Sequence, residues 1–168
     1  MIRARIAPPA VLITAWLLVP GAAAAADRCT GNLDADHIAR CLMRTRSMTI
    51  GAPPPAASAN LVVQFDFGSA KLTEAGRHTL DQLAEALRAE ALRDVRFEVA
   101  GHTDSIGSEE FNLVLSRHRA EAARDFLSAR GIDPARLETK GYGTQRPYDP
   151  DHPDAAENRR VQVTRLSP

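Results

Sequence analysis

The chain has 168 residues, which suits one domain of ordinary size with extensions, since domains commonly run about 100 to 150 residues. Hydrophobic residues make up 44% of the sequence and charged residues 25%, a composition that excludes a disordered or fibrous chain. The formal charge is zero and no stretch gathers basic residues with interleaved aromatic ones, so the sequence does not indicate a nucleic-acid-binding protein.

The first 26 residues predict a secretory signal peptide. Arg3 and Arg5 precede an apolar run over residues 10–19, and small residues follow up to an Ala-x-Ala cleavage site before Asp27. The run is well short of the roughly 20 apolar residues of a spanning helix, so we expect no transmembrane segment in the mature chain, with an uncleaved anchor as the alternative. Loss of the two arginines would leave 19 of the 21 basic residues against 21 acidic ones, a net charge of −2.

Residues 27–50 form a small leader segment that contains the chain's two cysteines, Cys29 and Cys41. In an exported protein, two cysteines at this spacing favour one intramolecular disulfide, and the residues between them could form a short helix closed by that bond. A metal site that includes His37 is the alternative, although the spacing matches no common zinc signature. The residues before Cys29 do not form a lipobox, so we expect no lipid anchor.

Residues 51–60 carry three successive prolines among small residues and predict an extended linker, because such a run favours polyproline II and supplies no backbone donors. The main domain is therefore expected over residues 61–168. Its first strand, residues 61–67, alternates apolar and polar side chains, which places Asp66 on the face away from the core. A helix capped by Thr73 follows, with an apolar stripe at helical spacing formed by Leu80, Leu83, Ala84, Leu87 and Ala91.

Three further strands and a second long helix complete the predicted domain. The strands are expected at residues 95–100, residues 137–141 and around residues 161–163. The helix should span residues 108–130 and bury Leu115, Ala122, Ala123, Phe126 and Leu127. The order strand, helix, strand, helix, strand, strand predicts an α+β fold, a βαβαββ two-layer sandwich with a mixed four-stranded sheet covered by helices.

Residues 101–120 concentrate polar side chains around one loop and the helix after it. Asp104 follows the second strand at the start of a turn, and Asn112, Ser116 and Arg119 recur at i, i+4 and i+7, on one face of the helix. That face can look back at Asp104, which would set a carboxylate acceptor near a planar guanidinium donor. Asp104 and Arg119 could instead pair with each other, or Asp104 could only cap the turn.

This block resembles the OmpA-like C-terminal domain family, which includes peptidoglycan-associated lipoproteins and flagellar stator anchor domains. The family pattern of Gly-His-Thr-Asp, Gly, Asn and Leu-Ser-x-x-Arg-Ala falls within residues 101–120. Its outlying parts appear as Phe65-Asp66-Phe67, Gly141-Tyr142-Gly143 and Asn158-Arg159-Arg160-Val161, although Thr144 stands where many members carry an acid. The resemblance implies the same fold and a place in the periplasm of a Gram-negative-type envelope, associated with peptidoglycan and the outer membrane.

The resemblance also implies that the chain binds peptidoglycan noncovalently through the diaminopimelate residue of the stem peptide. The free end of diaminopimelate carries an ammonium and a carboxylate on one carbon, for which Asp104 and Arg119 are the matching partners. Either Arg159 or Arg160 would also face the site, because strand alternation allows only one of them to do so. The candidate peptidoglycan-binding residues are therefore Asp104, Arg119, Asn112, Thr103, Leu115, Arg159 and Asp66.

Two other functions remain open from the sequence. His102, Asp104 and His118 could serve a metal-dependent hydrolase, although the guanidinium of Arg119 beside them would oppose a divalent cation. The domain could instead be an interaction module that contacts another envelope protein. The sequence contains no nucleophile elbow, Walker loop or dinucleotide-binding glycine motif, so we expect a protein that is not an enzyme and has no cofactor.

Overall fold

The computed structural model of the protein describes residues 29–31, 33–43 and 57–166. The predicted signal peptide and most of the predicted linker lie outside the described residues. Within the described ranges, no helix is both long enough and apolar enough to cross a membrane.

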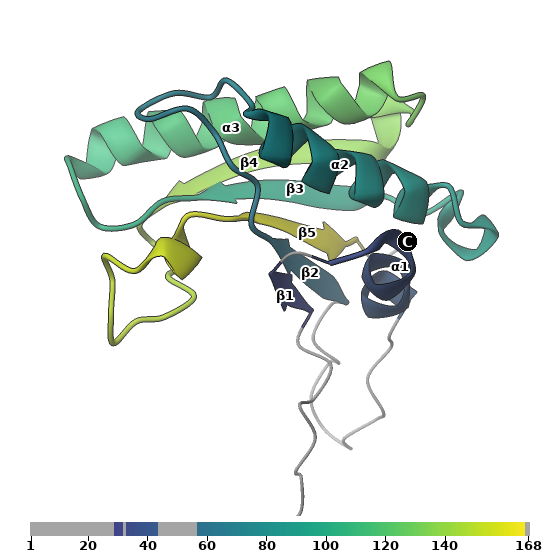
Figure 1. Ribbon diagram of the computed structural model, residues 1–168, viewed down its shortest axis with the longest axis horizontal. Coiled ribbons are helices and arrows are strands. Elements are labelled where there is room, and N and C mark those ends of the chain that lie inside the picture. The colour runs from purple at the N-terminus through teal and green to yellow at the C-terminus, as the bar shows by residue number, and fades with distance from the viewer. Residues whose placement is uncertain (1–28, 32, 44–56, 167–168) are drawn as a thin grey trace, which may run out of the picture.

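Five strands form one mixed sheet in the order β1-β2-β5-β3-β4, with the helices packed against it (Figure 1). β1 and β2 are parallel, as are β3 and β4, whereas β5 runs antiparallel to its neighbours β2 and β3. The strands are β1 Thr30–Gly31, β2 Ser58–Leu61, β3 Phe97–His102, β4 Leu137–Gly143 and β5 Val161–Arg165. The helices are α1 Ala35–Met43, α2 Glu74–Leu87 and α3 Glu109–Ala129, with short 3-10 turns η1 Glu90–Leu92, η2 Pro134–Arg136 and η3 Ala156–Asn158.

The predicted α+β sandwich is confirmed, with a correction to the number of strands. α2 connects β2 to β3 and α3 connects β3 to β4, and β5 lies between β2 and β3. These two crossovers and the final strand are the predicted βαβαββ order. The leader adds a fifth strand, β1, at the edge of the predicted four-stranded sheet, because its backbone pairs with β2.

The first strand of the domain lies earlier than predicted. β2 begins at Ser58, inside the predicted linker, and it ends at Leu61, where the predicted strand begins. Residues 58–61 pair with β5, and the chain then leaves the sheet, so that Phe65 forms only an isolated bridge with Leu72. The alternation over residues 61–67 therefore does not reflect strand pairing.

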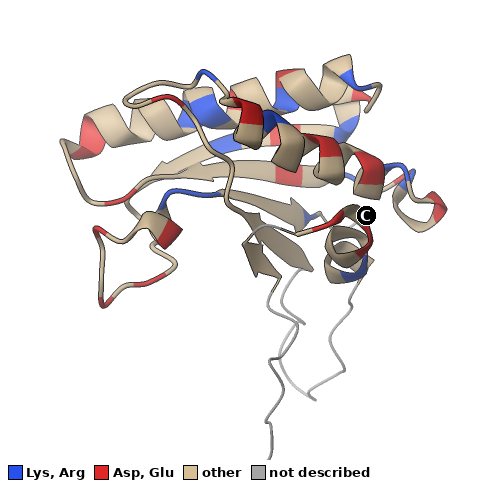
Figure 2. Ribbon diagram, viewed as in Figure 1, with Lys and Arg blue, Asp and Glu red and all other residues tan. Residues whose placement is uncertain are grey.

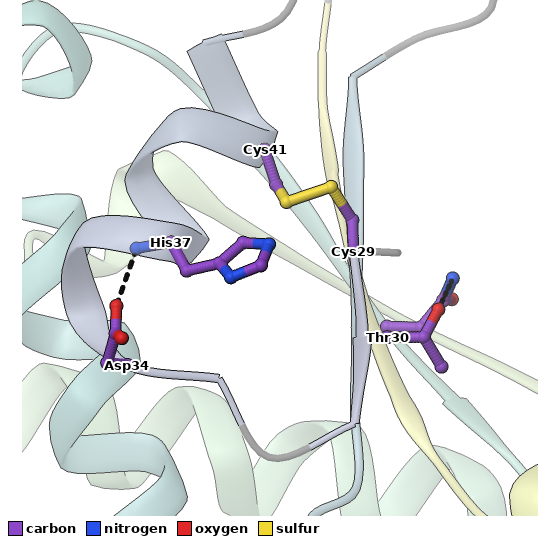
Figure 3. Close-up of a disulfide and its surroundings, with 6 residues drawn as sticks. Cys29, Thr30, Asp34, His37 and Cys41 are labelled. Carbon is purple, nitrogen blue, oxygen red and sulfur yellow. Dashed lines mark hydrogen bonds between the residues drawn. A yellow bond between two sulfur atoms is a disulfide. The ribbon is translucent and has the colours of Figure 1, made fainter. Parts of the chain in front are cut away.

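The leader is fastened to the domain by a disulfide and by apolar contacts. Cys29, next to β1, is bonded to Cys41 of α1, with their Cα atoms 5.8 Å apart, which confirms the predicted disulfide (Figure 3). Ile38 and Leu42 of α1 are fully buried in the common core. The core of the protein therefore includes the leader as well as the main domain.

The predicted cap at Thr73 is confirmed, the structure adds a cap at Ser108, and the end of α2 is corrected. The Thr73 hydroxyl accepts a hydrogen bond from the Gly76 backbone N–H at 3.1 Å, and the Ser108 hydroxyl accepts one from Phe111 N–H at 3.2 Å. α2 ends at Leu87, so Ala91 is exposed and does not continue the apolar stripe. Leu92 of η1 is buried in its place.

α3 packs unusually close to the sheet through small residues. Its buried face consists of Asn112, Ser116, Ala120, Ala123 and Leu127, whereas the predicted core residues Leu115, Ala122 and Phe126 are half-buried. A Cβ atom added to Gly101 of β3 would overlap the backbone carbonyl oxygen of Ser116, and one added to Gly141 of β4 would meet the Ser116 hydroxyl and the backbone of Arg117. The glycines thus set how near the helix can approach.

We expect Gly101→Ala to destabilise the fold by about 1–3 kcal/mol, because the added methyl group meets helix backbone that cannot rotate away. Urea denaturation followed by circular dichroism measures this free energy of unfolding. Arg117→Ala, at an exposed position of the same helix, should change it by no more than about 0.5 kcal/mol. Equal stability of Gly101→Ala and wild type would contradict the close packing.

Candidate functional site

The pairing of β3 with β5 brings together two polar segments that are distant in sequence. Gly101 lies opposite Val161 in the antiparallel ladder, and the backbone N–H of His102 continues it by donating to the Arg160 carbonyl at 3.0 Å. The residues after β3 therefore lie beside those that precede β5. α3 begins a few residues after β3, so its first turns cover the same end of the sheet.

Asp104 follows β3 at this end of the sheet and is only 8% exposed. Its Oδ2 accepts a hydrogen bond from Arg159 Nη1 at 2.8 Å, and its Oδ1 accepts one from the Ile106 backbone N–H at 3.2 Å. The carboxylate is thus paired with Arg159 and not with Arg119. Of the two arginines left open by the sequence, Arg159 is the one that contacts Asp104.

The loop that carries Asp104 is fixed from several sides. The buried Asn112 side chain donates to the Ile106 carbonyl at 2.9 Å, and Ser105 N–H donates to the Pro153 carbonyl at 2.9 Å. Thr103 N–H donates to the Gly143 carbonyl at 3.0 Å, while its enclosed hydroxyl has no hydrogen-bond partner among the described residues. The loop therefore presents Asp104 in a defined position.

Arg119 approaches from α3 and is held without a carboxylate. Its Nε donates to the Ser69 carbonyl at 3.0 Å, and its guanidinium carbon lies 5.1 Å from the centre of the Phe65 ring. Within the part of the chain that the structure describes, no carboxylate pairs with it at 4.0 Å or less. Burial lowers the pKa of Arg119 and Asp104 opposes that shift, but an arginine remains protonated near neutral pH.

These side chains line a groove of about 550 Å³. It contains six of the predicted site residues, namely Thr103, Asp104, Asn112, Leu115, Arg119 and Arg159. Asp66 does not line it, and pairs with Lys71 at 3.4 Å on a nearby turn. The groove also gathers Phe65, Phe67 and Phe111, which are three of the chain's five phenylalanines.

The aromatic side chains of the groove were not predicted as site residues. Phe67 is fully exposed, and Phe111 and Ile106 are more than half exposed. The sequence did carry a signal, because the chain has few aromatic residues and two of them flank Asp66. Exposed phenylalanines around a polar centre provide apolar surface for the hydrocarbon part of a ligand.

A second cavity, of about 330 Å³, shares Phe65, Arg119 and Arg159 with the groove and is called the basic cavity below. Its other lining residues are Val62, Val63, Gln64, His102, Ala156 and Arg160. The chain leaves the sheet after Leu61, so the segment that follows forms one wall of this cavity. Figure 2 shows basic residues on the stretch between η3 and β5 that forms another wall.

His102 is 1% exposed and stacks on Tyr142, with the ring centres 5.3 Å apart. Burial, together with the positive charges of Arg160 and Arg146, lowers the pKa of His102 to about 3, and weaker contacts with Gln162 and the Arg146 backbone oppose this shift. Neither ring nitrogen has a well-formed hydrogen bond among the described residues. His102 is therefore neutral at physiological pH.

The hydrolase alternative required His102, Asp104 and His118 to act together. The structure buries His102 against Tyr142, places Asp104 in the groove and leaves His118 exposed on α3. In the described ranges no three histidine, cysteine, aspartate or glutamate side chains are grouped so that they could hold a metal ion.

The buried His102 should make the protein sensitive to acid. Its pKa is about 3 in the folded state and near 6.5 in the unfolded chain, so the unfolded chain binds the proton first as the pH falls. Stability from this residue is complete above pH 6.5 and is lost towards pH 3, by up to about 1.4 kcal/mol per pH unit. Between pH 7 and pH 4.5 we expect His102→Gln to lose roughly 2–3 kcal/mol less free energy of unfolding than wild type.

Urea denaturation at several pH values measures both slopes. His118→Gln, at an exposed position, should retain the wild-type slope. A slope for His102→Gln that matches wild type would contradict a neutral buried imidazole.

Comparison of the sequence with known proteins identifies a family that this chain matches. The model of the OmpA family matches residues 64–160. Outer membrane protein A of Bordetella avium is 40% identical over 101 residues, which cover 59% of this chain and 51% of that protein. The peptidoglycan-associated lipoprotein of Pseudomonas aeruginosa is 36% identical over 101 residues, covering 59% and 58%. The chain therefore spans little more than half the length of these two relatives.

A solved structure shows the same fold. The crystal structure of the peptidoglycan-associated lipoprotein from Burkholderia pseudomallei superposes with a TM-score of 0.52 at 31% sequence identity. The superposition covers 62% of this chain and 88% of that protein. The part of this chain that superposes therefore corresponds to nearly the whole of the Burkholderia pseudomallei structure.

Proposed function

The chain belongs to the OmpA family, and on that basis we propose that it binds peptidoglycan noncovalently through the diaminopimelate residue of the stem peptide. Relatives named as outer membrane proteins and peptidoglycan-associated lipoproteins support a role in the cell envelope. The family and these relatives are structural or binding proteins and not enzymes. The function is therefore sought in a binding site and not in a reaction.

The observation that carries the proposal is the arrangement of Asp104, Arg119 and Arg159 in one groove. Asp104 is the carboxylate, and Arg119 is a charged guanidinium that is held by a carbonyl and an aromatic ring and not by a carboxylate. The three groups carry a net charge of about +1, which leaves a guanidinium available to a ligand carboxylate. A ligand that carries an ammonium next to a carboxylate can pair with Asp104 and with Arg119 at the same time.

In this arrangement the ammonium of diaminopimelate is bound by Asp104 and its carboxylate by Arg119, and Arg159, which lines the same groove, can share the carboxylate. The phenylalanines and Leu115 give the aliphatic chain of the ligand an apolar surface. Thr103 offers an enclosed hydroxyl to the ligand. Asn112 acts indirectly, because it holds the loop that positions Asp104.

Asp66 remains a candidate at the edge of this site. Its side chain is 46% exposed and lies between Phe65 and Phe67 in sequence, both of which line the groove. It could therefore contact a part of the stem peptide beyond the diaminopimelate end. Its pairing with Lys71 is exposed and weak enough to be exchanged for a ligand contact.

We also propose that the chain is exported and acts in the periplasm. The sequence supports this through the predicted signal peptide with cleavage before Asp27. The Cys29–Cys41 disulfide agrees with an oxidising compartment. In that location the domain would anchor its chain to the cell wall.

Asp104→Asn and Arg119→Ala should each weaken binding to diaminopimelate-containing sacculi by roughly 30-fold to several thousand-fold. Each removes one partner of a charge pair that the ligand would complete in a shielded groove, a loss of about 2–5 kcal/mol. Arg119→Lys should restore little, because an ammonium keeps the charge but not the bidentate fork. Co-sedimentation with purified sacculi over a range of protein concentrations measures the affinities.

Arg117→Ala is the matched control, since it removes an exposed arginine two positions away on the same helix. It should bind like wild type, and its salt dependence separates specific recognition from general charge attraction. If wild type, Asp104→Asn and Arg119→Ala are retained equally on sacculi while circular dichroism shows all three folded, the proposed clamp is wrong.

A further inference from the structure

Arg160 is a buried cation that has no carboxylate partner among the residues that the structure describes. It is 7% exposed, and its nearest acceptors are Asn60 Oδ1, 3.2 Å from Nε, and the Arg146 carbonyl, 3.2 Å from Nη2. Its Nη1 is enclosed and has no hydrogen-bond partner within the described ranges. A buried guanidinium normally has its donors satisfied and its charge compensated, and the described residues supply no anion that would do this for Arg160.

The surroundings of Arg160 are positive as well. Arg119 and Arg159 line the same basic cavity, and Asp104, which does not line it, is already bonded to Arg159. Burial lowers the pKa of Arg160 to about 10, and the group that opposes this shift is the phenol of Tyr148 and not a carboxylate. The charges that act on the neighbouring His102 are those of arginines. Three guanidinium groups thus line the cavity, and no carboxylate of the described residues is among its lining residues.

The cavity has room for a small ligand. Its volume of about 330 Å³ compares with roughly 30 Å³ for a water molecule in the liquid. The exposed Ala156 is one of its lining residues, and the segment that follows β2 forms part of its wall. A compact oxyanion fits this space and matches the donor geometry of the guanidinium groups.

We propose that the basic cavity is an oxyanion-binding site, in which a carboxylate or phosphate group is bound by Arg160 together with Arg119 and Arg159. The oxyanion comes either from a free small anion or from a second carboxylate of the same stem peptide. The inference does not depend on the proposed clamp, because its anchor, Arg160, does not line the groove. It does predict that a ligand in the groove and an anion in the cavity share two arginines.

The test is a titration of the wild-type protein with inorganic phosphate, followed through the NMR signals of the arginine Nε–H groups, with sodium chloride holding the ionic strength constant. We expect a saturable shift of the Arg160 signal. Arg160→Lys should weaken the binding by about tenfold or more, because it keeps a charge but loses the fork. Ala156→Phe should weaken it similarly by placing a bulky side chain at the lining of the cavity, and Ala156 takes no part in the hydrogen bonds of Arg160.

Ala155→Phe, next in sequence but outside the cavity lining, is the control and should bind phosphate like wild type. Asp104→Asn should lose sacculus binding but still bind phosphate, so the two proposals can fail separately.

A diaminopimelate-containing tripeptide is the second ligand. If it shifts the Arg160 signal where phosphate does not, the anion is the stem carboxylate. No saturable shift with either ligand would overturn the inference, and so would equal affinity of wild type and Ala156→Phe for the ligand that does shift the Arg160 signal.

Discussion

The antiparallel pairing of β3 with β5 is the constraint on which the site depends. Its register places the loop after β3 against the residues before β5, so Asp104 and Arg159 meet although 55 positions separate them. The same pairing lets α3 return over the sheet from the loop, with glycines in β3 and β4 permitting close contact. A slip of one residue would turn the side chains on both segments to the opposite face and dismantle the site.

The second feature on which the site depends is a pair of arginines, Arg119 and Arg160, that are held by neutral groups and not by carboxylates. Arg119 is positioned by the Ser69 carbonyl and the Phe65 ring, and Arg160 by Asn60 and a backbone carbonyl. Holding a guanidinium through neutral groups fixes its position but leaves its charge uncompensated. Anionic ligands can then supply the missing partner without first displacing an internal carboxylate.

Much of the fold could be predicted from local patterns. The apolar stripe of α2, the cap at Thr73 and the Cys29–Cys41 disulfide depend on residues close in sequence. The structure confirms them, except that the stripe ends at Leu87 and does not include Ala91. The strand predicted at residues 61–67 was placed wrongly, because Phe65 and Phe67 alternate with polar residues where they line a groove and not a sheet. Alternation of apolar and polar residues shows that a segment has one apolar face and one polar face. It does not show whether the apolar face packs against a sheet or lines a groove.

For the candidate site, the sequence predicted that most of the polar residues lie together but not how they pair. Asp104, Arg119 and Asn112 stand out by type and spacing, and the structure brings them to one groove. Arg119 donates to a backbone carbonyl, and every residue has such a group, so the sequence does not indicate this partner. The partner of Asp104 depends on the register of the strands, which the sequence does not show directly. Likewise, Ser116 is buried because glycines admit the helix backbone, a contact that side-chain hydrophobicity does not indicate.

The central claim is that the groove reads an ammonium and a carboxylate at once, and calorimetric titration with two synthetic stem tripeptides tests it most directly. The peptides differ only in their third residue, meso-diaminopimelate or lysine, so they share the side-chain ammonium and differ in the carboxylate beside it. The account predicts that the diaminopimelate peptide binds about 30-fold or more tightly, since the lysine peptide leaves Arg119 without its partner. Equal affinity for the two peptides would contradict it.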